Sequence, residues 1–303
     1  MRLTPVVRLL ALGTVAISAL AACGSSSNAL GGGQASPDKI IIGSANFAEN
    51  ELLADIYAGA LTKAGASVST KLNIGSREVY LKALDDGSIN VLPEYTGALL
   101  SYYDKTATQS APADVYSVLG KALPQGLALL EYSQAEDKDS LAVTQQVAQQ
   151  YKLKSMADLA PVCGQLTLGG GPEFQTRQQG VVGIKSVYGC TFRDYKSYAT
   201  DTPLLPQALV AGEVQVANIF TTDPSVAKNK FVVLDDPKSL FSAQNVVPLY
   251  KGGALSQPAQ DALNKVSKAL TTADLATLVQ KIKVDQMPAA DVAAGWLKDK
   301  NLG

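Results

Sequence analysis

An internal repeat with an offset of about 125 residues constrains the fold of this chain more than any other feature. Residues 83 to 91 read ALDDGSINV, and residues 208 to 216 read ALVAGEVQV. Tyr95-Thr96 follows the first copy, and Phe220-Thr221 follows the second at the same distance. Each copy is typical of a helix end, a glycine turn and a buried strand, so the sequence predicts two halves built on one plan. The alternative is a chance similarity between two ordinary α/β units.

The opening of each half repeats as well. Ile42-Gly43 leads into Ser44-Ala45-Asn46-Phe47, and Leu168-Gly169 leads into Gly170-Gly171-Pro172-Glu173-Phe174. Both segments predict a strand, a glycine turn and a helix N-terminus. Open α/β sheets bind ligands outside the carboxyl ends of their strands, where helix N-termini also point. We therefore expect matched segments from both halves to line one site.

Strands and helices alternate along the first half, as in parallel α/β sheets. The apolar spacing predicts strands over residues 40–42, 68–72 and 89–92, and helices over 47–64 and 76–85. The predicted fold class is α/β, with two doubly wound lobes, a hinge and a central cleft.

The C-terminal region predicts a return to the first lobe. A short strand over residues 231–234 is followed by helical patterns over 258–270, 273–282 and 289–297. Two crossings between the lobes are expected, near residues 131–139 and near 240–245. A cleft would lie between the lobes.

The N-terminus predicts export. Residues 1–22 carry two arginines, an apolar run and small residues, which is typical of a secretory signal peptide. A single membrane anchor is the alternative, but the run is shorter than the ~20 residues of a spanning helix. Leu20-Ala21-Ala22-Cys23 resembles a bacterial lipobox, which implies acylation of Cys23. Residues 23–37 are expected to form a lipidated, flexible tether, with the protein on the outer face of the cell membrane.

Two further cysteines remain, Cys163 and Cys190. In an exported chain this pair favours a disulfide, although two unpaired buried cysteines are the alternative. Metal binding would need more ligands close by, so no metal site is predicted.

Composition excludes several function classes. The chain has 26 Lys and Arg against 27 Asp and Glu, without a basic cluster, so nucleic acid is not an expected partner. It contains no histidine, which removes Ser-His-Asp catalysis and His-ligated zinc. No phosphate loop or nucleotide fingerprint is present, and no cofactor is predicted. The protein is not expected to be an enzyme.

Several short motifs of this chain are informative together. The most specific is Pro93-Glu94-Tyr95-Thr96-Gly97 with the preceding ALxxGxI pattern, and weaker ones are Gly75-Ser76, Pro172-Glu173-Phe174 with Arg177, and Thr221-Thr222-Asp223. These motifs resemble the solute-binding proteins of ABC transporters for glycine betaine, choline and proline betaine, the ProX/OpuC type. The resemblance covers residues 39 to 302.

The resemblance implies the class II periplasmic-binding-protein fold, closure around a small osmolyte-like solute, and delivery to an ABC permease in the membrane. The expected lobes are residues 38–136 with 243–303, and residues 137–242. A monomer is expected.

The resemblance and the predicted cleft together indicate a set of ligand-binding residues: Asn46, Phe47, Tyr95, Thr96, Asp137, Glu173, Arg177, Phe220, Thr221 and Gln244. Thr96 and Arg177 stand where the family places carboxylate-binding groups, and Asp137 where it places an acid near the cation. The aromatic cage of the family is depleted, because its positions hold Pro93, Asp139, Phe220 and Gln244, and Ala45 replaces a lysine. Low affinity for glycine betaine is therefore predicted.

Three alternatives stay open. The same receptor fold could take a polyhydroxylated or aromatic ligand instead of a quaternary ammonium. An envelope hydrolase could pair Glu94 with Glu173, because two carboxylates suffice for glycoside chemistry. A structural or adhesive lipoprotein would leave the paired cleft motifs unexplained.

Overall fold

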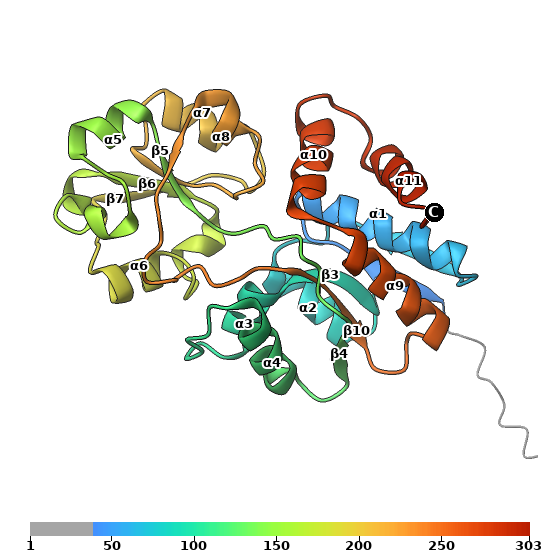
Figure 1. The fold of residues 1–303 in the computed structure, drawn as a ribbon. Coiled ribbons are helices and arrows are strands. Elements are labelled where there is room, and N and C mark those ends of the chain that lie inside the picture. The colour runs from blue at the N-terminus through green and yellow to red at the C-terminus, as the bar shows by residue number, and fades with distance from the viewer. Residues whose placement is uncertain (1–38) are drawn as a thin grey trace, which may run out of the picture. The chain divides into compact units, whose positions relative to one another are not determined.

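The computed structural model describes residues 39–303, which form two lobes (Figure 1). The expected signal peptide (1–22) and the whole tether expected over 23–37, including Cys23, lie outside the described residues. Within 39–303, no helix has both the length and the apolar character needed to cross a membrane.

The first lobe is built on a five-stranded sheet with the order β2-β1-β3-β10-β4. Its strands are β1 (Ile40–Gly43), β2 (Val68–Lys71), β3 (Val91–Tyr95), β4 (Leu127–Leu129) and β10 (Val246–Lys251). β1 pairs in parallel with β2 and β3, whereas β10 runs antiparallel to β3 and β4. The parallel pairing expected from the alternation therefore holds for the first three strands, and a C-terminal strand makes the sheet mixed.

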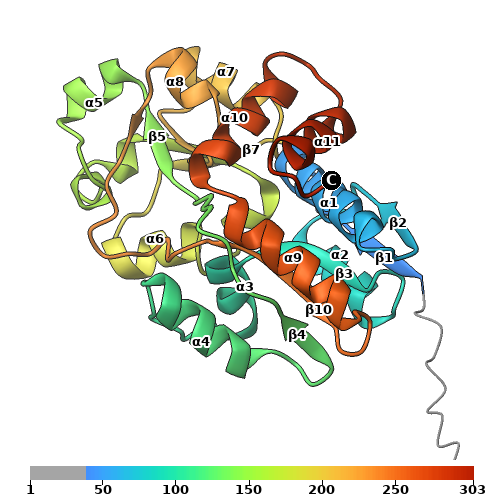
Figure 2. The ribbon, with the colours of Figure 1, turned by 45° about the vertical axis from the view of Figure 1, so that its right-hand side comes forward.

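Seven helices of the described chain belong to the first lobe: α1 (Ala48–Lys63), α2 (Arg77–Asp85), α3 (Thr96–Tyr103), α4 (Pro112–Ala122), α9 (Gln257–Ala269), α10 (Thr272–Lys283) and α11 (Ala289–Asp299). α1 packs against the three C-terminal helices, which lie beside it in both views (Figure 2). Tyr57 of α1 and Trp296 of α11 are buried in the core between them. The chain therefore returns to complete its first lobe, as expected.

The second lobe repeats the plan with the strand order β7-β6-β8-β5-β9. Its strands are β5 (Leu141–Val143), β6 (Thr167–Gly170), β7 (Asp194–Ser197), β8 (Val216–Asn218) and β9 (Val232–Val233). β6 pairs in parallel with β7 and β8, and β5 is antiparallel to β8 and β9. The α-helices of this lobe are α5 (Gln145–Tyr151), α6 (Val181–Tyr188), α7 (Leu204–Val210) and α8 (Ser225–Asn229), and its 3-10 helices are η1 (Met156–Leu159), η2 (Cys163–Gln165) and η3 (Pro172–Gln175).

The repeated sequences occupy equivalent places in the two sheets. Ile42 is in register with Val91 in the first sheet, and Leu168 is in register with Val216 in the second. The repeated glycine after Ile42 has a packing reason, because a Cβ at Gly43 would clash with the side chain of Ile89. At the matching Gly169, a Cβ would clash with Leu205 and lie 3.2 Å from Val214. In both lobes, therefore, the repeated glycine allows the end of one strand to lie close to the residue two positions before the next strand, Ile89 in the first lobe and Val214 in the second.

The chain crosses between the lobes twice, and the two crossing segments pair with each other. Glu136 and Asn245 form an antiparallel bridge. The amide of Asp137 donates to the carbonyl of Gln244 over 3.2 Å, and the amide of Val246 donates to the carbonyl of Ala135 over 3.0 Å. These segments run side by side between the lobes (Figure 1). The residue boundaries expected at 136/137 and 242/243 stay predictions.

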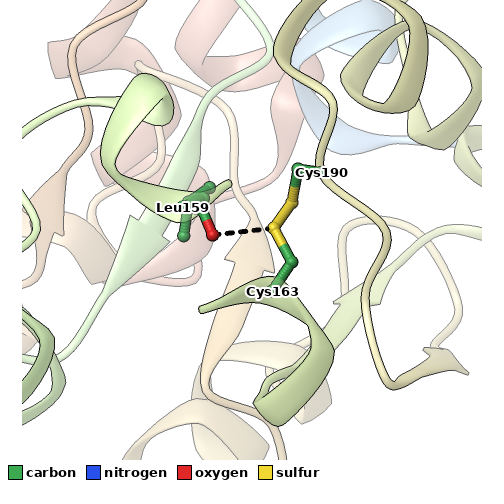
Figure 3. Close-up of a disulfide and its surroundings, with 3 residues drawn as sticks. All are labelled: Leu159, Cys163 and Cys190. Atoms are coloured by element: carbon green, nitrogen blue, oxygen red, sulfur yellow. Dashed lines mark hydrogen bonds between the residues drawn. A yellow bond between two sulfur atoms is a disulfide. The ribbon is translucent and has the colours of Figure 1, made fainter. Parts of the chain in front are cut away.

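A disulfide joins Cys163 of η2 to Cys190, which follows α6, within the second lobe (Figure 3). The two Cα atoms lie 5.6 Å apart, and both side chains are buried. The sulfur of Cys163 also lies 3.0 Å from the carbonyl oxygen of Leu159 at the end of η1. The bridge thus ties the segment before β6 to the segment before β7.

Candidate functional site

A pocket with a volume of about 70 Å³ lies between the lobes, and we call it the interlobe pocket. Its lining comes from both lobes and from the crossing segments: Ala45, Asn46, Phe47, Ser76, Arg77, Tyr80, Tyr95, Ala98, Asp137, Asp139, Glu173, Arg177, Thr200, Phe220 and Gln244. The first-lobe residues lie after β1, at the start of α2 and where β3 leads into α3. The pocket therefore sits at the carboxyl ends of strands, where the repeat predicted it.

Three aromatic rings form a contiguous group in this pocket. Phe47 precedes α1, Tyr95 ends β3, and Phe220 follows β8. The ring of Phe47 stacks on Tyr95 with centroids 6.1 Å apart and on Phe220 with centroids 5.9 Å apart. A cation over a ring face that this stacking leaves open would be attracted by the ring quadrupole.

Two aspartates of the first crossing segment line the pocket near these rings. Oδ1 of Asp137 accepts hydrogen bonds from the amide of Thr222 (3.1 Å) and the hydroxyl of Thr221 (3.3 Å). Asp139 accepts from the amide group of Asn218 over 2.9 Å. Burial raises the pKa of both aspartates, and the charge of Glu49 adds to the increase for Asp137. Both aspartates are therefore groups that a bound cation would stabilise in the charged form.

Glu49 lies next to the pocket at the start of α1 and joins the lobes. Its carboxylate accepts from the hydroxyl of Tyr95 over 2.6 Å and from the hydroxyl of Thr222, in the second lobe, over 2.7 Å. Burial raises the pKa of Glu49 to about 7, and the two hydrogen bonds only partly oppose this increase.

Arg77 at the start of α2 is held in a buried ion pair with Glu94 of β3. Nε and Nη2 of Arg77 lie 2.9 and 3.0 Å from the two carboxylate oxygens. Glu94 also accepts from the hydroxyl of Tyr80 over 2.7 Å and from the amide of Tyr95 over 2.8 Å. The charge of Arg77 is therefore compensated within the first lobe.

Arg177, which follows η3 in the second lobe, forms a similar pair across the cleft. Its Nε and Nη2 donate to the two carboxylate oxygens of Glu78 in α2 over 3.1 and 3.0 Å. Partial burial of Glu78 opposes ionisation, but the hydrogen bonds and charge of Arg177 outweigh it and lower the pKa of Glu78 to about 2. Arg177 was expected to bind a ligand carboxylate, and in this structure it binds a protein carboxylate.

A second cross-lobe cluster lies at the end of α10. The ammonium of Lys283 contacts Asp201 over 2.6 Å and Asp223 over 2.5 Å, and both aspartates belong to the second lobe. Asp201 also accepts from the amide of Ala48 over 2.6 Å. The two ion-pair clusters therefore join the lobes at separate places around the pocket.

The structure brings eight of the ten expected ligand-binding residues into the pocket lining: Asn46, Phe47, Tyr95, Asp137, Glu173, Arg177, Phe220 and Gln244. Thr96 and Thr221 do not line it. The hydroxyl of Thr96 donates to the carbonyl of Ala243 and accepts from the amide of Asn245, both over 3.1 Å. Thr221 accepts from the amide of Lys138 over 2.9 Å. Both threonines therefore hold the crossing segments in place.

Of the four positions of the family's aromatic cage, Asp139, Phe220 and Gln244 line the pocket, and so does Ala45, which stands where the family has a lysine. Pro93 does not line it, and its carbonyl accepts from the side chain of Asn50 over 3.1 Å. Five lining residues were not expected: Ser76, Arg77, Tyr80, Ala98 and Thr200. Ser76 is the N-cap of α2, and Arg77 and Tyr80 lie on its first turn, so the available signal was a helix N-terminus after a strand end.

Two mixed sheets of matching strand order, two crossings and a pocket between the lobes define the class of two-lobed solute-binding proteins. Residues 38–299 match the family described as the substrate binding domain of ABC-type glycine betaine transport systems. The chain belongs to this family, whose members are binding proteins of transporters and not enzymes.

Relatives of similar length support this assignment. The chain is 25% identical over 282 residues to a glycine-betaine-binding protein of Pseudomonas aeruginosa, covering 89% of this chain and 90% of that protein. It is 27% identical over 280 residues to the glycine betaine-binding protein YehZ of Escherichia coli, covering 88% and 91%. A crystal structure of a glycine betaine/carnitine/choline ABC transporter protein has the same fold, with a TM-score of 0.69, 21% identity, and coverage of 87% of this chain and 99% of that one.

Proposed function

We propose that this protein is the substrate-binding lipoprotein of an ABC importer, and that it captures a small betaine- or choline-type solute between its lobes. The observation that carries the proposal is the stacked group of Phe47, Tyr95 and Phe220 beside the buried carboxylate of Asp137. Ring faces and an anion together favour an ammonium group.

Closure of the lobes is part of the proposal. The lining is divided between the lobes, so only a closed arrangement surrounds a ligand. The cross-lobe bonds of Arg177 with Glu78 and of Lys283 with Asp201 and Asp223 favour this arrangement. The loaded protein then delivers its solute to a membrane permease of the transporter.

The anchor is proposed from the sequence of the N-terminal region, where Cys23 follows a lipobox-like segment. One acyl chain binds membranes only marginally, and lipoprotein modification supplies several. Replacing Cys23 with serine should move the protein from the membrane fraction to the soluble fraction. Unchanged partition of the Cys23→Ser variant between the two fractions would contradict the anchor.

Thermal-shift screening of the purified protein tests the ligand class. A solute that binds only the folded state raises the melting temperature by mass action. We expect shifts with choline, betaines and their demethylated analogues, and none with sugars. A panel in which sugars or neutral aromatic compounds shift the melting temperature and no ammonium compound does would contradict the proposal.

A polyhydroxylated or aromatic ligand is the second candidate. Asp137, Asp139 and Gln244 present side-chain oxygens that could accept hydrogen bonds from hydroxyl groups. A second cavity of about 70 Å³ also adjoins the pocket and shares Asp139, Glu173, Arg177, Thr200 and Phe220 with it. A ligand larger than a betaine would extend into that cavity, and the same screening panel distinguishes the two candidates.

A further inference from the structure

We propose that the interlobe pocket prefers a small cation that carries N–H groups, such as a protonated secondary or tertiary amine, to a quaternary ammonium ion and to a zwitterionic betaine. The inference rests on the proposed function, because it takes the interlobe pocket as the solute site. It refines the class of solute that this site selects.

Within the described chain, the lining has no unpaired arginine that could bind the carboxylate of a ligand. Five charged residues line the pocket: Arg77, Asp137, Asp139, Glu173 and Arg177. Both arginines are paired with glutamates through two hydrogen bonds each, Arg77 with Glu94 and Arg177 with Glu78. The three other carboxylates of the lining form no ion pair with residues 39–303, and only Asp139 feels the charges of the two arginines at longer range. A cationic ligand compensates this charge, whereas a neutral ligand or a zwitterion does not.

The acceptors of the pocket are suited to N–H donors. Asp137 is 3% exposed, and no hydrogen bond from residues 39–303 reaches its Oδ2 atom. Oδ2 of Asp139 has only a long contact of 3.4 Å with the amide nitrogen of Gln244. A buried carboxylate oxygen gains most from a charged donor, because such hydrogen bonds are stronger than neutral ones. A quaternary ammonium carries no N–H to donate.

The aromatic rings do not offset this polar character. Phe47 stacks on both Tyr95 and Phe220, so the three rings form one contiguous wall. The fourth lining ring, Tyr80, is tied through its hydroxyl to Glu94. Methyl groups of a quaternary ammonium gain most where rings surround them on several sides. Here Asp139 and Gln244 occupy part of the lining, and they favour hydrogen bonds over methyl contacts.

A methyl-by-methyl ligand series tests the preference directly. Calorimetric titration of the purified protein would compare choline, N,N-dimethylethanolamine and N-methylethanolamine, and separately glycine betaine with N,N-dimethylglycine. We expect about tenfold tighter binding when the first methyl of choline is replaced by N–H. We also expect each amino alcohol to bind more tightly than the amino acid with the same number of methyl groups.

The Asp139→Asn variant tests the residue assignment. It keeps an oxygen that can accept from Asn218 but removes the charge. The tenfold preference should fall to about threefold or less. Asp299→Asn, at the exposed end of α11, is the matched control and should keep the full preference. The wild-type ligand series is informative even where a variant folds poorly.

The outcomes separate this inference from the proposed function. Tighter binding of choline or glycine betaine than of their demethylated analogues would overturn the preference for N–H donors and leave the proposed function standing. An Asp139→Asn variant that folds and keeps the full preference would overturn the role of Asp139. Absence of binding by every compound in the series would overturn both the inference and the proposed function.

Discussion

The guanidinium of Arg177 and the carboxylate of Glu78 meet across the cleft through two hydrogen bonds of 3.1 and 3.0 Å. Arg177 belongs to the second lobe and Glu78 to the first. The side chains are 34% and 42% exposed, so water and salt weaken the pair. The guanidinium expected to bind a ligand carboxylate is therefore already paired with Glu78. Because the pair is exposed, it stabilises the closed arrangement of the lobes only slightly.

Freeing Arg177 should change which ligand the protein prefers. In the Glu78→Gln variant the guanidinium loses its charged partner and becomes available to a carboxylate in the pocket. We expect the affinity for glycine betaine to rise about three- to tenfold relative to the affinity for choline. Both affinities are measured by calorimetric titration, and their ratio cancels any common effect on closure.

Glu131→Gln, an exposed substitution on the first crossing segment, is the matched control for this comparison. It should leave the ratio of the two affinities unchanged. An unchanged ratio in Glu78→Gln as well would mean that Arg177 does not reach the ligand carboxylate.

The stability of the protein should depend on the ionisation of Glu49. Burial raises its pKa from 4.5 to about 7, while Tyr95 and Thr222 donate to it, Asp201 and Asp137 repel its charge, and Lys283 attracts it. The folded state therefore holds a proton between these pH values that the unfolded state has released. The contribution of Glu49 to stability is present in full below about pH 4.5 and is lost as the pH rises through 7.

Urea unfolding at pH 5, 6, 7 and 8 measures this contribution. The wild-type free energy of unfolding should fall relative to that of Glu49→Gln as the pH rises, because glutamine carries no charge at any pH. Glu131→Gln should follow the wild-type profile. A constant difference between the wild type and Glu49→Gln over this range would show that Glu49 is ionised throughout.

The bridge between Cys163 and Cys190 should stabilise the second lobe through its unfolded state. The cysteines are 27 residues apart in sequence. A loop of this length corresponds to about 3 to 4 kcal/mol on the chain-entropy account. The double variant Cys163→Ala/Cys190→Ala should lower the free energy of unfolding by about this amount, measured by urea denaturation. Mass spectrometry of the native exported protein that finds both thiols free to alkylation would contradict the bridge.

Local patterns predicted much of the fold. The helices expected over residues 258–270, 273–282 and 289–297 are α9, α10 and α11, with ends that differ by at most two residues. The strand expected over 89–92 instead spans Val91–Tyr95, and the side chain of Ile89 lies beside Gly43 of β1. The antiparallel strand β10 depends on pairing with β3, more than 150 residues away, which no local pattern encodes.

The candidate site was predictable where it follows the repeat and unpredictable where it depends on cross-lobe pairing. Phe47, Tyr95 and Phe220 lie at repeated strand and helix ends, and all three line the pocket. The partner of Arg177 lies 99 residues away in α2, and its charge is one of many along the sequence. No spacing rule selects Glu78 among these charges. The pairing of Arg177 with a protein carboxylate could therefore be found only in the folded structure.

The central claim is that an ammonium solute binds between the lobes against Phe47, Tyr95 and Phe220. Calorimetric titration of choline into the wild type, Phe220→Ala and the control Tyr102→Ala tests it most directly, because Tyr102 is exposed on α3 and does not line the pocket. We predict one site per chain, about tenfold weaker binding in Phe220→Ala, and wild-type binding in Tyr102→Ala. Equal affinities in all three proteins, or no binding of choline to the wild type, would contradict the account.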